Sequence, residues 1–421
     1  MSRTKLPIKI AVATARFVVV ALASSTRAAA QTETDVFNFD DAAGFGETPN
    51  APLIFDAHGN LYGTTSSGGA NSSQLGVAFE LNPAVGGGWT ETILHSFTGG
   101  VDGEFPLGGL VMDHAGNLYG TTQGSGGNNV SDGGTVFEVS PVEGGGWTET
   151  VLYSFNTNGT DAQFPRGSLI FDHAGNLYGT GAVGGAYNEG AIFELSPTAG
   201  GGWTEKVIYS FSNNGTDGQI PEGALVFDAA GNLYGATTRG GSDNDGIVFE
   251  LTRRAGAWTE KILHTFDHNG QDGSAPSSNL IFDGAGNLYG ATSLGGSHPC
   301  NCGTVFELTP KAGGFWSEKI LHSFHNTDGW SPTGGVIFDA VGNLYGGTYQ
   351  GGPNAYGYGT VFELSPTGTG VWTEKVLHAF GTGTDGQNPY GGLVFGSGGN
   401  LYGTTIYGGA DYGGMVFELT P

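Results

Sequence analysis

Six aspartates recur at one equivalent position of the chain, in Gly-rich turns where carboxylates can hold a cation or cap the turn. They are Asp102, Asp161, Asp217, Asp272, Asp328 and Asp385. The stretch 267–273 is partly similar to an oxygen-rich calcium loop but lacks the full ligand set and the terminal Glu. We therefore expect solvated turn acids with no metal and no cofactor, and calcium is the alternative.

Aromatic residues gather in the variable loops of the C-terminal part of the chain, and some lie beside carboxylates. The rings are Trp330, Tyr349, Tyr356, Tyr358, Tyr390, Tyr407 and Tyr412, and the acids are Asp328, Asp385 and Asp411. Flat rings beside carboxylates suit stacking on sugar faces with hydrogen bonds to hydroxyls. Such a patch equally suits a protein partner or simple packing within its own loops. We take these residues as the candidate site for a glycan or protein ligand.

Signatures of catalysis are weak. A glycosidase needs two carboxyl groups about 5–10 Å apart, and Asp385 and Asp411 are the pair to test because they lie in adjoining loops. Four histidines share one position at which two other units carry tyrosine, so packing is preferred to catalysis; they are His95, His264, His322 and His378. No nucleophile elbow, phosphate loop or dinucleotide fingerprint occurs in the right context. We expect no catalytic residue, with a carbohydrate-active hydrolase or lyase as the alternative.

The chain has two cysteines, Cys300 and Cys302, which exclude a disulfide-rich scaffold. Their C-x-C spacing favours a local disulfide in an oxidising compartment, or free thiols. Metal binding with His298 is the alternative, although the sequence shows no fourth ligand.

The elements that position these residues come from an internal repeat. The phrase Gly-Asn-Leu-Tyr-Gly occurs seven times, at intervals of 55 to 59 residues; it begins at Gly59, Gly116, Gly175, Gly231, Gly286, Gly342 and Gly399. Each unit contains four runs of strand length, rich in β-branched and aromatic residues and bounded by turn residues. Four-stranded units repeated in tandem predict an all-β, seven-bladed β-propeller with four antiparallel strands per blade.

Residues present in every unit are assigned to the fold. The Asp of each Asp-x-x-Gly-Asn turn should accept turn N–H groups, the Glu of Phe-Glu-Leu should bond to its neighbours, and the tryptophan opening the fourth strand should pack. The Thr-Glu pair that follows this tryptophan is expected to place charge on the exposed blade edge.

The two ends of the repeat region are complementary. The last unit stops after its third strand, and residues 32–39 align with the fourth strand at 373–380. The N-terminal strand is therefore predicted to complete the last blade, closing the ring and hiding an open edge.

Residues 1–30 read as a signal peptide, with basic residues around an apolar stretch and a small-residue site at 28–30. Residues 31–421 then form the propeller. The net charge of −25 disfavours nucleic acid and anionic membrane as partners. No later segment is apolar enough to cross a membrane. We expect a secreted or periplasmic monomer.

The repeated Gly-Asn-Leu-Tyr-Gly-Thr-Thr, the following Gly-Gly and Gly-Thr-Val-Phe-Glu-Leu resemble the "GloVer" tandem repeats of exported bacterial proteins, often called choice-of-anchor proteins, over about residues 32–421. The resemblance implies export, usually with a C-terminal sorting signal, whereas this chain ends on the repeat itself. It implies no activity. The resulting hypothesis is an exported, non-enzymatic binding or surface-scaffold propeller for a glycan or protein ligand.

Overall fold

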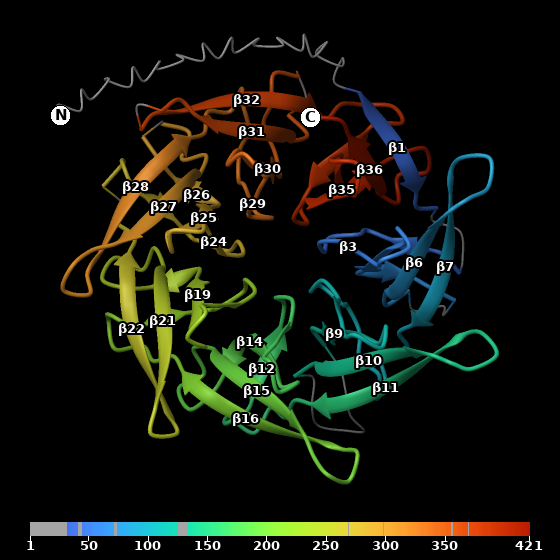
Figure 1. Cartoon of the computed structure of the whole chain (residues 1–421), viewed down its shortest axis with the longest axis horizontal. Helices are drawn as coiled ribbons and strands as arrows, with labels where there is room; N and C mark the ends of the chain where they lie inside the picture. Colours follow the sequence, from blue (N-terminus) through green and yellow to red (C-terminus); the bar gives the residue numbers. More distant parts are fainter. Residues whose placement is uncertain are drawn as a thin grey trace, which may run out of the picture. The chain divides into compact units, whose positions relative to one another are not determined.

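A computed structural model describes residues 32–40, 44–70, 74–124, 133–267, 269–297, 299–354, 357–368 and 370–421. Gln31–Pro421 form one compact unit, and residues 1–30, predicted as a signal peptide, lie outside the described residues. The described part of the chain contains strands and no helix, and hence no helix of the length and apolarity that crossing a bilayer requires. Seven antiparallel sheets surround a common axis (Figure 1). The predicted all-β, seven-bladed propeller is confirmed.

Each blade has four strands, which follow one another from the axis outward. Blade 1 contains β3 (Ile54–Phe55), β4 (Leu61–Thr65), β6 (Val77–Pro83) and β7 (Trp89–Ser96). Blade 2 contains β8 (Val111–Met112), β9 (Leu118–Thr122), β10 (Thr135–Pro141) and β11 (Trp147–Ser154). Blade 3 contains β13 (Ile170–Phe171), β14 (Leu177–Gly184), β15 (Ala191–Pro197) and β16 (Trp203–Ser210). Blade 4 contains β18 (Val226–Phe227), β19 (Leu233–Thr237), β21 (Ile247–Arg254) and β22 (Ala257–Thr265).

The remaining blades follow the same plan. Blade 5 contains β24 (Ile281–Phe282), β25 (Leu288–Thr292), β27 (Thr304–Pro310) and β28 (Trp316–Ser323). Blade 6 contains β29 (Val336–Phe338), β30 (Leu344–Thr348), β31 (Thr360–Pro366) and β32 (Trp372–Ala379). Blade 7 contains β34 (Val394–Phe395), β35 (Leu401–Gly408), β36 (Met415–Leu419) and, as its outer strand, β1 (Glu33–Asn38).

The ring is closed by the N-terminal strand, as the sequence predicts. β1 pairs antiparallel with β36, with Glu33 opposite Leu419 and Asn38 opposite Met415. Nearer the axis, the Thr404 hydroxyl of blade 7 donates to the Ala51 carbonyl oxygen at the start of blade 1. In Figure 1 the blue β1 lies against the red β36, so the first and last strands share one sheet.

The repeated residues build the turns and the blade contacts. In blade 1, Asp56 accepts the backbone N–H groups of His58 and Asn60 at 2.8 and 2.9 Å, and Tyr62 donates to Glu80 at 2.8 Å. The Trp147 ring of blade 2 packs edge-on against Tyr62 at a centroid distance of 6.2 Å. The structural roles predicted for these repeated residues are therefore confirmed.

The loops that differ between units lie on one face of the ring. In each blade, the loop entering the blade pairs with the loop between its second and third strands, which explains the short extra strands. These are β2 (Gly46–Glu47) with β5 (Ser67–Gly68), β17 (Gly218–Gln219) with β20 (Arg239–Gly240), β23 (Gly273–Ser274) with β26 (Leu294–Gly295), and β12 (Ala162–Pro165) and β33 (Gly386–Pro389) with β14 and β35. Both kinds of variable loop are thus held together.

Candidate functional site

The clearest candidate site is a pocket on the propeller axis, built from one position of the repeat. Every unit carries a proline before its innermost strand, and the residue beside it lines the pocket. The seven residues at this position are all different: Asn50, Leu107, Arg166, Glu222, Ser277, Thr333 and Tyr390. This position lies at the axis in all blades and repeats in none, so it makes the centre of the sevenfold scaffold chemically asymmetric.

Backbone strain marks the same place in every blade. The residue before each proline has a positive φ of 53° to 60°, although none is glycine; these residues are Thr48, Phe105, Phe164, Ile220, Ala275, Ser331 and Asn388. Proline disfavours helical conformations of the residue before it, and side chains rarely adopt positive φ. Such strain costs about 1–3 kcal/mol per residue and persists only where surrounding contacts impose it.

Those contacts come from both neighbouring loops. The Ile220 N–H donates to Glu189 O of blade 3 at 2.9 Å, and Ile220 O accepts from Thr238 N of blade 4 at 3.1 Å. Equivalent bonds hold Phe105, whose N–H donates to Leu75 O and whose carbonyl accepts from Gln123 N. The strained residue therefore fixes the direction in which the chain enters the axial pocket.

Glycines after the variable residue bring neighbouring blades close together around the axis. A Cβ on Gly167 would lie 2.7 Å from Gly223 O of the next blade, and one on Gly391 would lie 2.5 Å from Ala51 O. Only a residue without a side chain fits at these two positions, whereas Ala51 and Ser278 stand at the equivalent positions of blades 1 and 5. The backbones form a narrow collar, and the variable side chains line a cavity of about 230 Å³.

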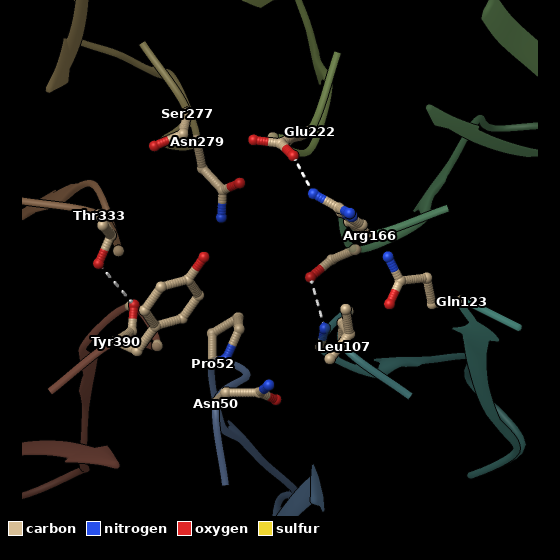
Figure 2. Close-up of a pocket in the computed structure, with 18 of the residues that line it drawn as sticks. Asn50, Pro52, Leu107, Gln123, Arg166, Glu222, Ser277, Asn279, Thr333 and Tyr390 are labelled. Atoms are coloured by element: carbon tan, nitrogen blue, oxygen red, sulfur yellow. Dashed lines mark hydrogen bonds and ion pairs between the residues drawn. The ribbon is translucent and has the colours of Figure 1, made fainter. Parts of the chain in front are cut away.

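One connected group of polar side chains in the axial pocket comes from blades 2, 3 and 4. Arg166 forms an ion pair with Glu222 (Figure 2). The Gln123 amide, with its oxygen turned toward the guanidinium, accepts from Arg166 Nε and Nη2 at 2.8 Å. Three side chains thus offer donors and acceptors in fixed directions on one side of the axis.

Tyr390 of blade 7 supplies the aromatic side of the pocket. Its ring lies opposite Arg166 and Glu222 in Figure 2, and the residue stays 43% exposed. Burial and the Glu222 charge raise the pKa of the Tyr390 phenol, whereas Arg166 opposes the rise. The phenol is therefore neutral at ordinary pH and can both donate and accept a hydrogen bond.

A second pocket of about 400 Å³ adjoins the first on blade 6, and three candidate aromatics line it: Trp330, Tyr349 and Tyr358. Tyr349 packs edge-on against Tyr390, with centroids 5.9 Å apart. Within this second pocket the Asn388 amide donates to Tyr349 O at 2.8 Å. Four of the predicted aromatics therefore lie along a path from the axis to blade 6.

The remaining candidate residues lie elsewhere. Tyr407 and Tyr412 are exposed on blade 7, at 48% and 66%, and Asp411 lies on the same exposed turn. Tyr356 lies outside the described residues. Neither described pocket is lined by Asp328, Asp385 or Asp411.

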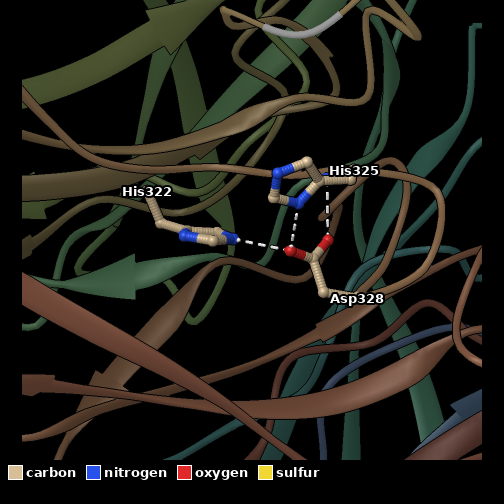
Figure 3. A group of neighbouring side chains, drawn as sticks. All are labelled: His322, His325 and Asp328. Atoms are coloured by element: carbon tan, nitrogen blue, oxygen red, sulfur yellow. Dashed lines mark hydrogen bonds and ion pairs between the residues drawn. The ribbon is translucent and has the colours of Figure 1, made fainter.

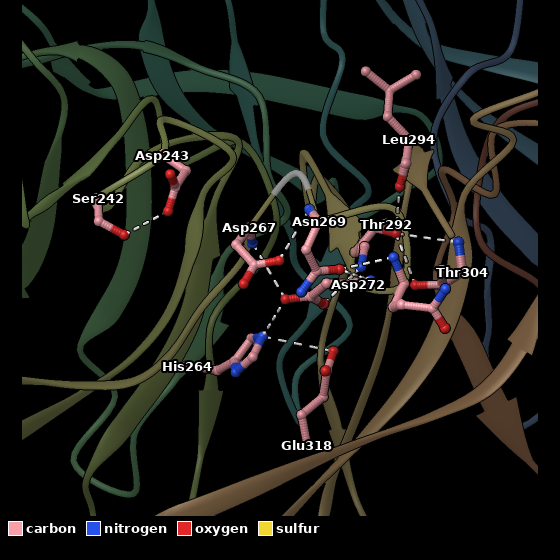
Figure 4. Close-up of polar contacts among 12 residues, drawn as sticks. Ser242, Asp243, His264, Asp267, Asn269, Asp272, Thr292, Leu294, Thr304 and Glu318 are labelled. Atoms are coloured by element: carbon pink, nitrogen blue, oxygen red, sulfur yellow. Dashed lines mark hydrogen bonds and ion pairs between the residues drawn. The ribbon is translucent and has the colours of Figure 1, made fainter. Parts of the chain in front are cut away.

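The expectation of solvated acids in the inter-blade loops is wrong. Four of these aspartates are at most 8% exposed; they are Asp102, Asp161, Asp217 and Asp272. Each bonds to the shared His or Tyr position, as His264 Nε2 does to Asp272 Oδ2 at 3.1 Å (Figure 4). Hydrogen bonds from His322 and His325 hold the pKa of Asp328 below its usual range, against the effect of burial. The His or Tyr on an outer strand therefore bonds to the Asp of the loop that follows, and this pair holds the loop against the strand.

The expectation that the outer-strand glutamates face solvent is also wrong. These side chains point back toward the preceding blade, and each has a buried carboxyl oxygen with no hydrogen-bond partner among the described residues: Glu33, Glu91, Glu149, Glu205, Glu260, Glu318 and Glu374. Burial, together with the Asp272 charge, raises the pKa of Glu318 to about 9, and burial raises that of Glu260 to about 8. Strand alternation explains the error, because the exposed residue of the pair is the one before the glutamate, Thr204 in blade 3 and Ser317 in blade 5.

Cys300 and Cys302 form a disulfide in the structure, and Cys302 is fully buried against the core between blades 5 and 6. His298, the third member of the alternative metal site, lies outside the described residues.

The axial position was missed at the sequence level although its signal is present. Aligning the units on the proline shows a column in which no residue type recurs, followed by small residues. The units share most of their residues, whereas the site lies where an otherwise regular unit varies.

Comparison with known proteins gives the family and the fold. The chain resembles the extracellular domain of a putative hybrid two-component system from B. thetaiotaomicron, with 12% identity and a TM-score of 0.53 over 91% of this chain and 39% of that one. It also resembles PorZ, a surface component of the type-IX secretion system of Porphyromonas gingivalis, with 15% identity and a TM-score of 0.50 over 88% and 46%. The chain therefore spans less than half of either relative.

An enzyme is among the similar structures as well. The periplasmic gluconolactonase PpgL of Pseudomonas aeruginosa has 14% identity and a TM-score of 0.46 over 82% of this chain and 91% of that one. No curated protein matches in sequence. The structural likenesses show the fold alone. The Gloeobacter/Verrucomicrobia repeat model matches residues 21–157, 130–300 and 298–421, and the chain therefore belongs to the Gloeobacter/Verrucomicrobia repeat family.

Proposed function

We propose that the protein is an exported, non-enzymatic binding propeller that recognises a neutral, hydroxyl-rich ligand, a glycan, at the axial pocket. The observation that carries this proposal is the variable position at the axis: seven different side chains converge on one cavity, while the backbone around them repeats. Variation confined to one lined cavity on a rigid scaffold is typical of ligand recognition.

The chemistry of the lining favours hydroxyl groups over charged groups. The Arg166 charge is already balanced by Glu222, so the pair offers donors beside acceptors with little net charge. Tyr390 adds a flat, half-exposed ring on the other side. A cavity of about 230 Å³ is smaller than the ~300–1,000 Å³ of drug-sized sites and suits one terminal sugar ring. The aromatic pocket around Trp330 and Tyr349 then accommodates the next unit of the chain.

Hydrolysis is less well supported than binding. The residues lining the two described pockets include one carboxylate, Glu222, whereas glycosidases use two. A lyase with a tyrosine base needs a lowered phenol pKa, but that of Tyr390 is raised. Asp385, the other candidate acid, is held by His378 Nε2 at 3.3 Å and by the Gly381 N–H at 2.7 Å.

A glycan array probed with the purified protein tests the proposal. We expect a defined set of glycans to bind, and Tyr390→Ala to reduce that binding at least tenfold. Tyr187→Ala is the matched control, because Tyr187 is 63% exposed on a blade 3 loop and lines neither pocket. Equal binding by wild type and Tyr390→Ala contradicts the axial site. Turnover of a bound glycan contradicts the non-enzymatic assignment.

Export and oligomeric state have separate tests. The proposal includes cleavage of residues 1–30, which N-terminal sequencing of the protein released by its host checks directly, with Gln31 as the expected first residue. Light scattering on the purified protein is expected to give the mass of a monomer.

A further inference from the structure

One blade interface differs chemically from the others. At six interfaces, a His or Tyr on the outer strand of one blade contacts the Asp of the following loop. Between blades 5 and 6, a second histidine joins them: His322, His325 and Asp328 occur with regular spacing in His-Ser-Phe-His-Asn-Thr-Asp. The residue equivalent to His325 in the other interfaces is Thr98, Asn156, Ser212, Asp267 or Gly381. The two-histidine set is thus specific to this interface.

The three side chains converge on one point (Figure 3). His322 Nε2 lies 3.2 Å and His325 Nδ1 lies 2.6 Å from the same oxygen, Asp328 Oδ2, and all three atoms lie within 4.8 Å of one another. Zn–N and Zn–O bonds of about 2.0–2.2 Å in a tetrahedral site separate ligand atoms by roughly 3.3 Å. A small opening of the His325 contact therefore gives the spacing of a metal-ligand set.

The surroundings also fit a cation. Glu374, on the adjoining outer strand of blade 6, has a buried carboxyl oxygen with no hydrogen-bond partner among the described residues. Burial and the Asp328 charge raise its pKa to about 7, while His322 and His325 oppose the rise, so Glu374 lies within electrostatic reach of all three. A bound cation offsets the cost of burying this carboxylate.

The site is reachable from solvent. His322 and His325 line a surface pocket of about 450 Å³, together with Gln271, Ser297 and Ile320. The His325 side chain is 49% exposed, whereas those of His322 and Asp328 are 16% and 14% exposed. Two of the three side chains are therefore nearly buried, and the third, His325, is half exposed.

We propose that His322, His325 and Asp328 bind one divalent transition-metal ion such as Zn²⁺, with a fourth position left open to water and Glu374 as the nearby counter-charge. Imidazole nitrogens favour zinc over calcium, which takes oxygen ligands. Three protein ligands with an open fourth position are the arrangement of accessible zinc sites rather than closed structural ones. The inference is independent of glycan binding at the axis.

Isothermal titration of the metal-free full chain with ZnCl₂ tests the site. We expect one tight zinc per chain, unaffected by excess CaCl₂, and a loss of affinity of at least about 100-fold in His325→Asn, more than the ~10–100-fold typical of outer-shell changes. His264→Asn is the matched control, because His264 occupies the position of His322 at the preceding interface, where Asp267 replaces the second histidine. Titrating Co²⁺ instead should give the visible absorption of a low-coordinate site, and this absorption should be absent in His325→Asn.

Each outcome decides the proposal. Because His325 is half exposed, its variant should fold, and an unchanged melting temperature of the metal-free variant checks this. Absence of tight zinc binding by the wild type overturns the site. If His325→Asn binds zinc with wild-type affinity, the zinc lies elsewhere and the proposed site is wrong. The same holds if only His264→Asn loses zinc binding.

Discussion

The Tyr209 hydroxyl of blade 3 donates a 2.9 Å hydrogen bond to Glu260 of blade 4, and so joins two outer strands through a carboxyl group whose pKa is raised to about 8. The same arrangement of His or Tyr, loop Asp and incoming Glu recurs at six of the seven interfaces. At the remaining one, Phe37 and Phe45 stand where the His and Asp would be. The His and the Asp are therefore replaced together, which indicates that these two act as a pair, whereas the incoming glutamate, Glu91, is kept at this interface.

The glutamates should make the propeller most stable in mild acid. Their pKa values in the folded state, about 7 to 9, exceed the ordinary value of 4.5. The folded state therefore holds these protons more tightly than the unfolded state does. The resulting stabilisation is fully present below pH 4.5 and is lost as pH rises through 7 to 9. The turn aspartates, such as Asp228, have lowered pKa values and act oppositely, losing stability as pH falls below 3.8. We expect the melting temperature to peak at about pH 4–5 and to fall steadily toward pH 9, as calorimetry can measure.

Replacing a glutamate that has a raised pKa should reduce the fall of the melting temperature at alkaline pH. Glu318→Gln keeps the shape of the protonated side chain but cannot ionise, so it should melt higher than wild type at pH 9 and close to it at pH 5. Glu143→Gln is the control, because Glu143 lies exposed in an outer turn of blade 2. If the melting temperatures of wild type and Glu318→Gln change with pH in parallel, the raised pKa of Glu318 does not contribute to the loss of stability.

Closure of the ring depends on Phe39, which follows β1 and is fully buried against Phe79, with ring centroids 5.2 Å apart. Phe39→Ala should lower the free energy of unfolding by about 3–5 kcal/mol, because it leaves a cavity where blades 7 and 1 meet. Urea denaturation measures this loss. Phe315→Ala, at a 75% exposed ring, should cost almost nothing. A near-neutral Phe39→Ala means that the N-terminal segment does not hold the ring closed.

Relieving the backbone strain before the axial pocket should stabilise the protein, in contrast to the Phe39→Ala substitution, which should destabilise it. Ala275 has φ +54°, a conformation that costs an alanine about 1–2 kcal/mol and a glycine almost nothing. Ala275→Gly should therefore leave the free energy of unfolding unchanged or raise it by up to about 1 kcal/mol. Ala78→Gly, in the buried strand β6, should lower it by roughly 1 kcal/mol. Destabilisation of both variants to the same degree would refute stored strain before the axial pocket.

The Arg166–Glu222 pair should matter more for binding than for folding. An ion pair this exposed stabilises a fold by about 0–1 kcal/mol, since the Arg166 side chain is 42% exposed. Arg166→Ala should thus shift the melting temperature little but weaken glycan affinity at least tenfold, equivalent to about 1.4 kcal/mol. Calorimetric titration with the best glycan from the array measures the second effect. Unchanged affinity would remove Arg166 from the recognition surface.

The fold was predictable because it rests on repetition. The Gly-Asn-Leu-Tyr-Gly phrase fixes the number of blades, and the alignment of residues 32–39 with 373–380 fixes how the ring closes. The burial of Glu318 was not predictable in the same way. Its strand alternates in the expected manner, but which face meets the neighbouring blade depends on how adjacent sheets pack.

The candidate site was predicted in part. Tyr390, Tyr349 and Trp330 do lie together, since the loops carrying them are adjacent around the ring. Their polar partners are Arg166 and Glu222, far earlier in the chain, and only closure of the ring brings blades 3 and 4 opposite blade 7. Asp328 and Asp385 bond to His322 and His378 on the outer strands, and this pairing was not predicted because the histidines were assigned to packing.

The seven segments around the axis, each a proline, a variable residue and a small residue, let the pocket change independently of the fold. Copying a whole repeat preserves every contact that holds a blade to its neighbours, yet one residue per copy can change without disturbing them. Specificity can therefore drift while foldability stays constant. The same property makes this propeller a suitable framework for directed evolution: a library randomised at seven codons, one per blade, would vary the pocket alone.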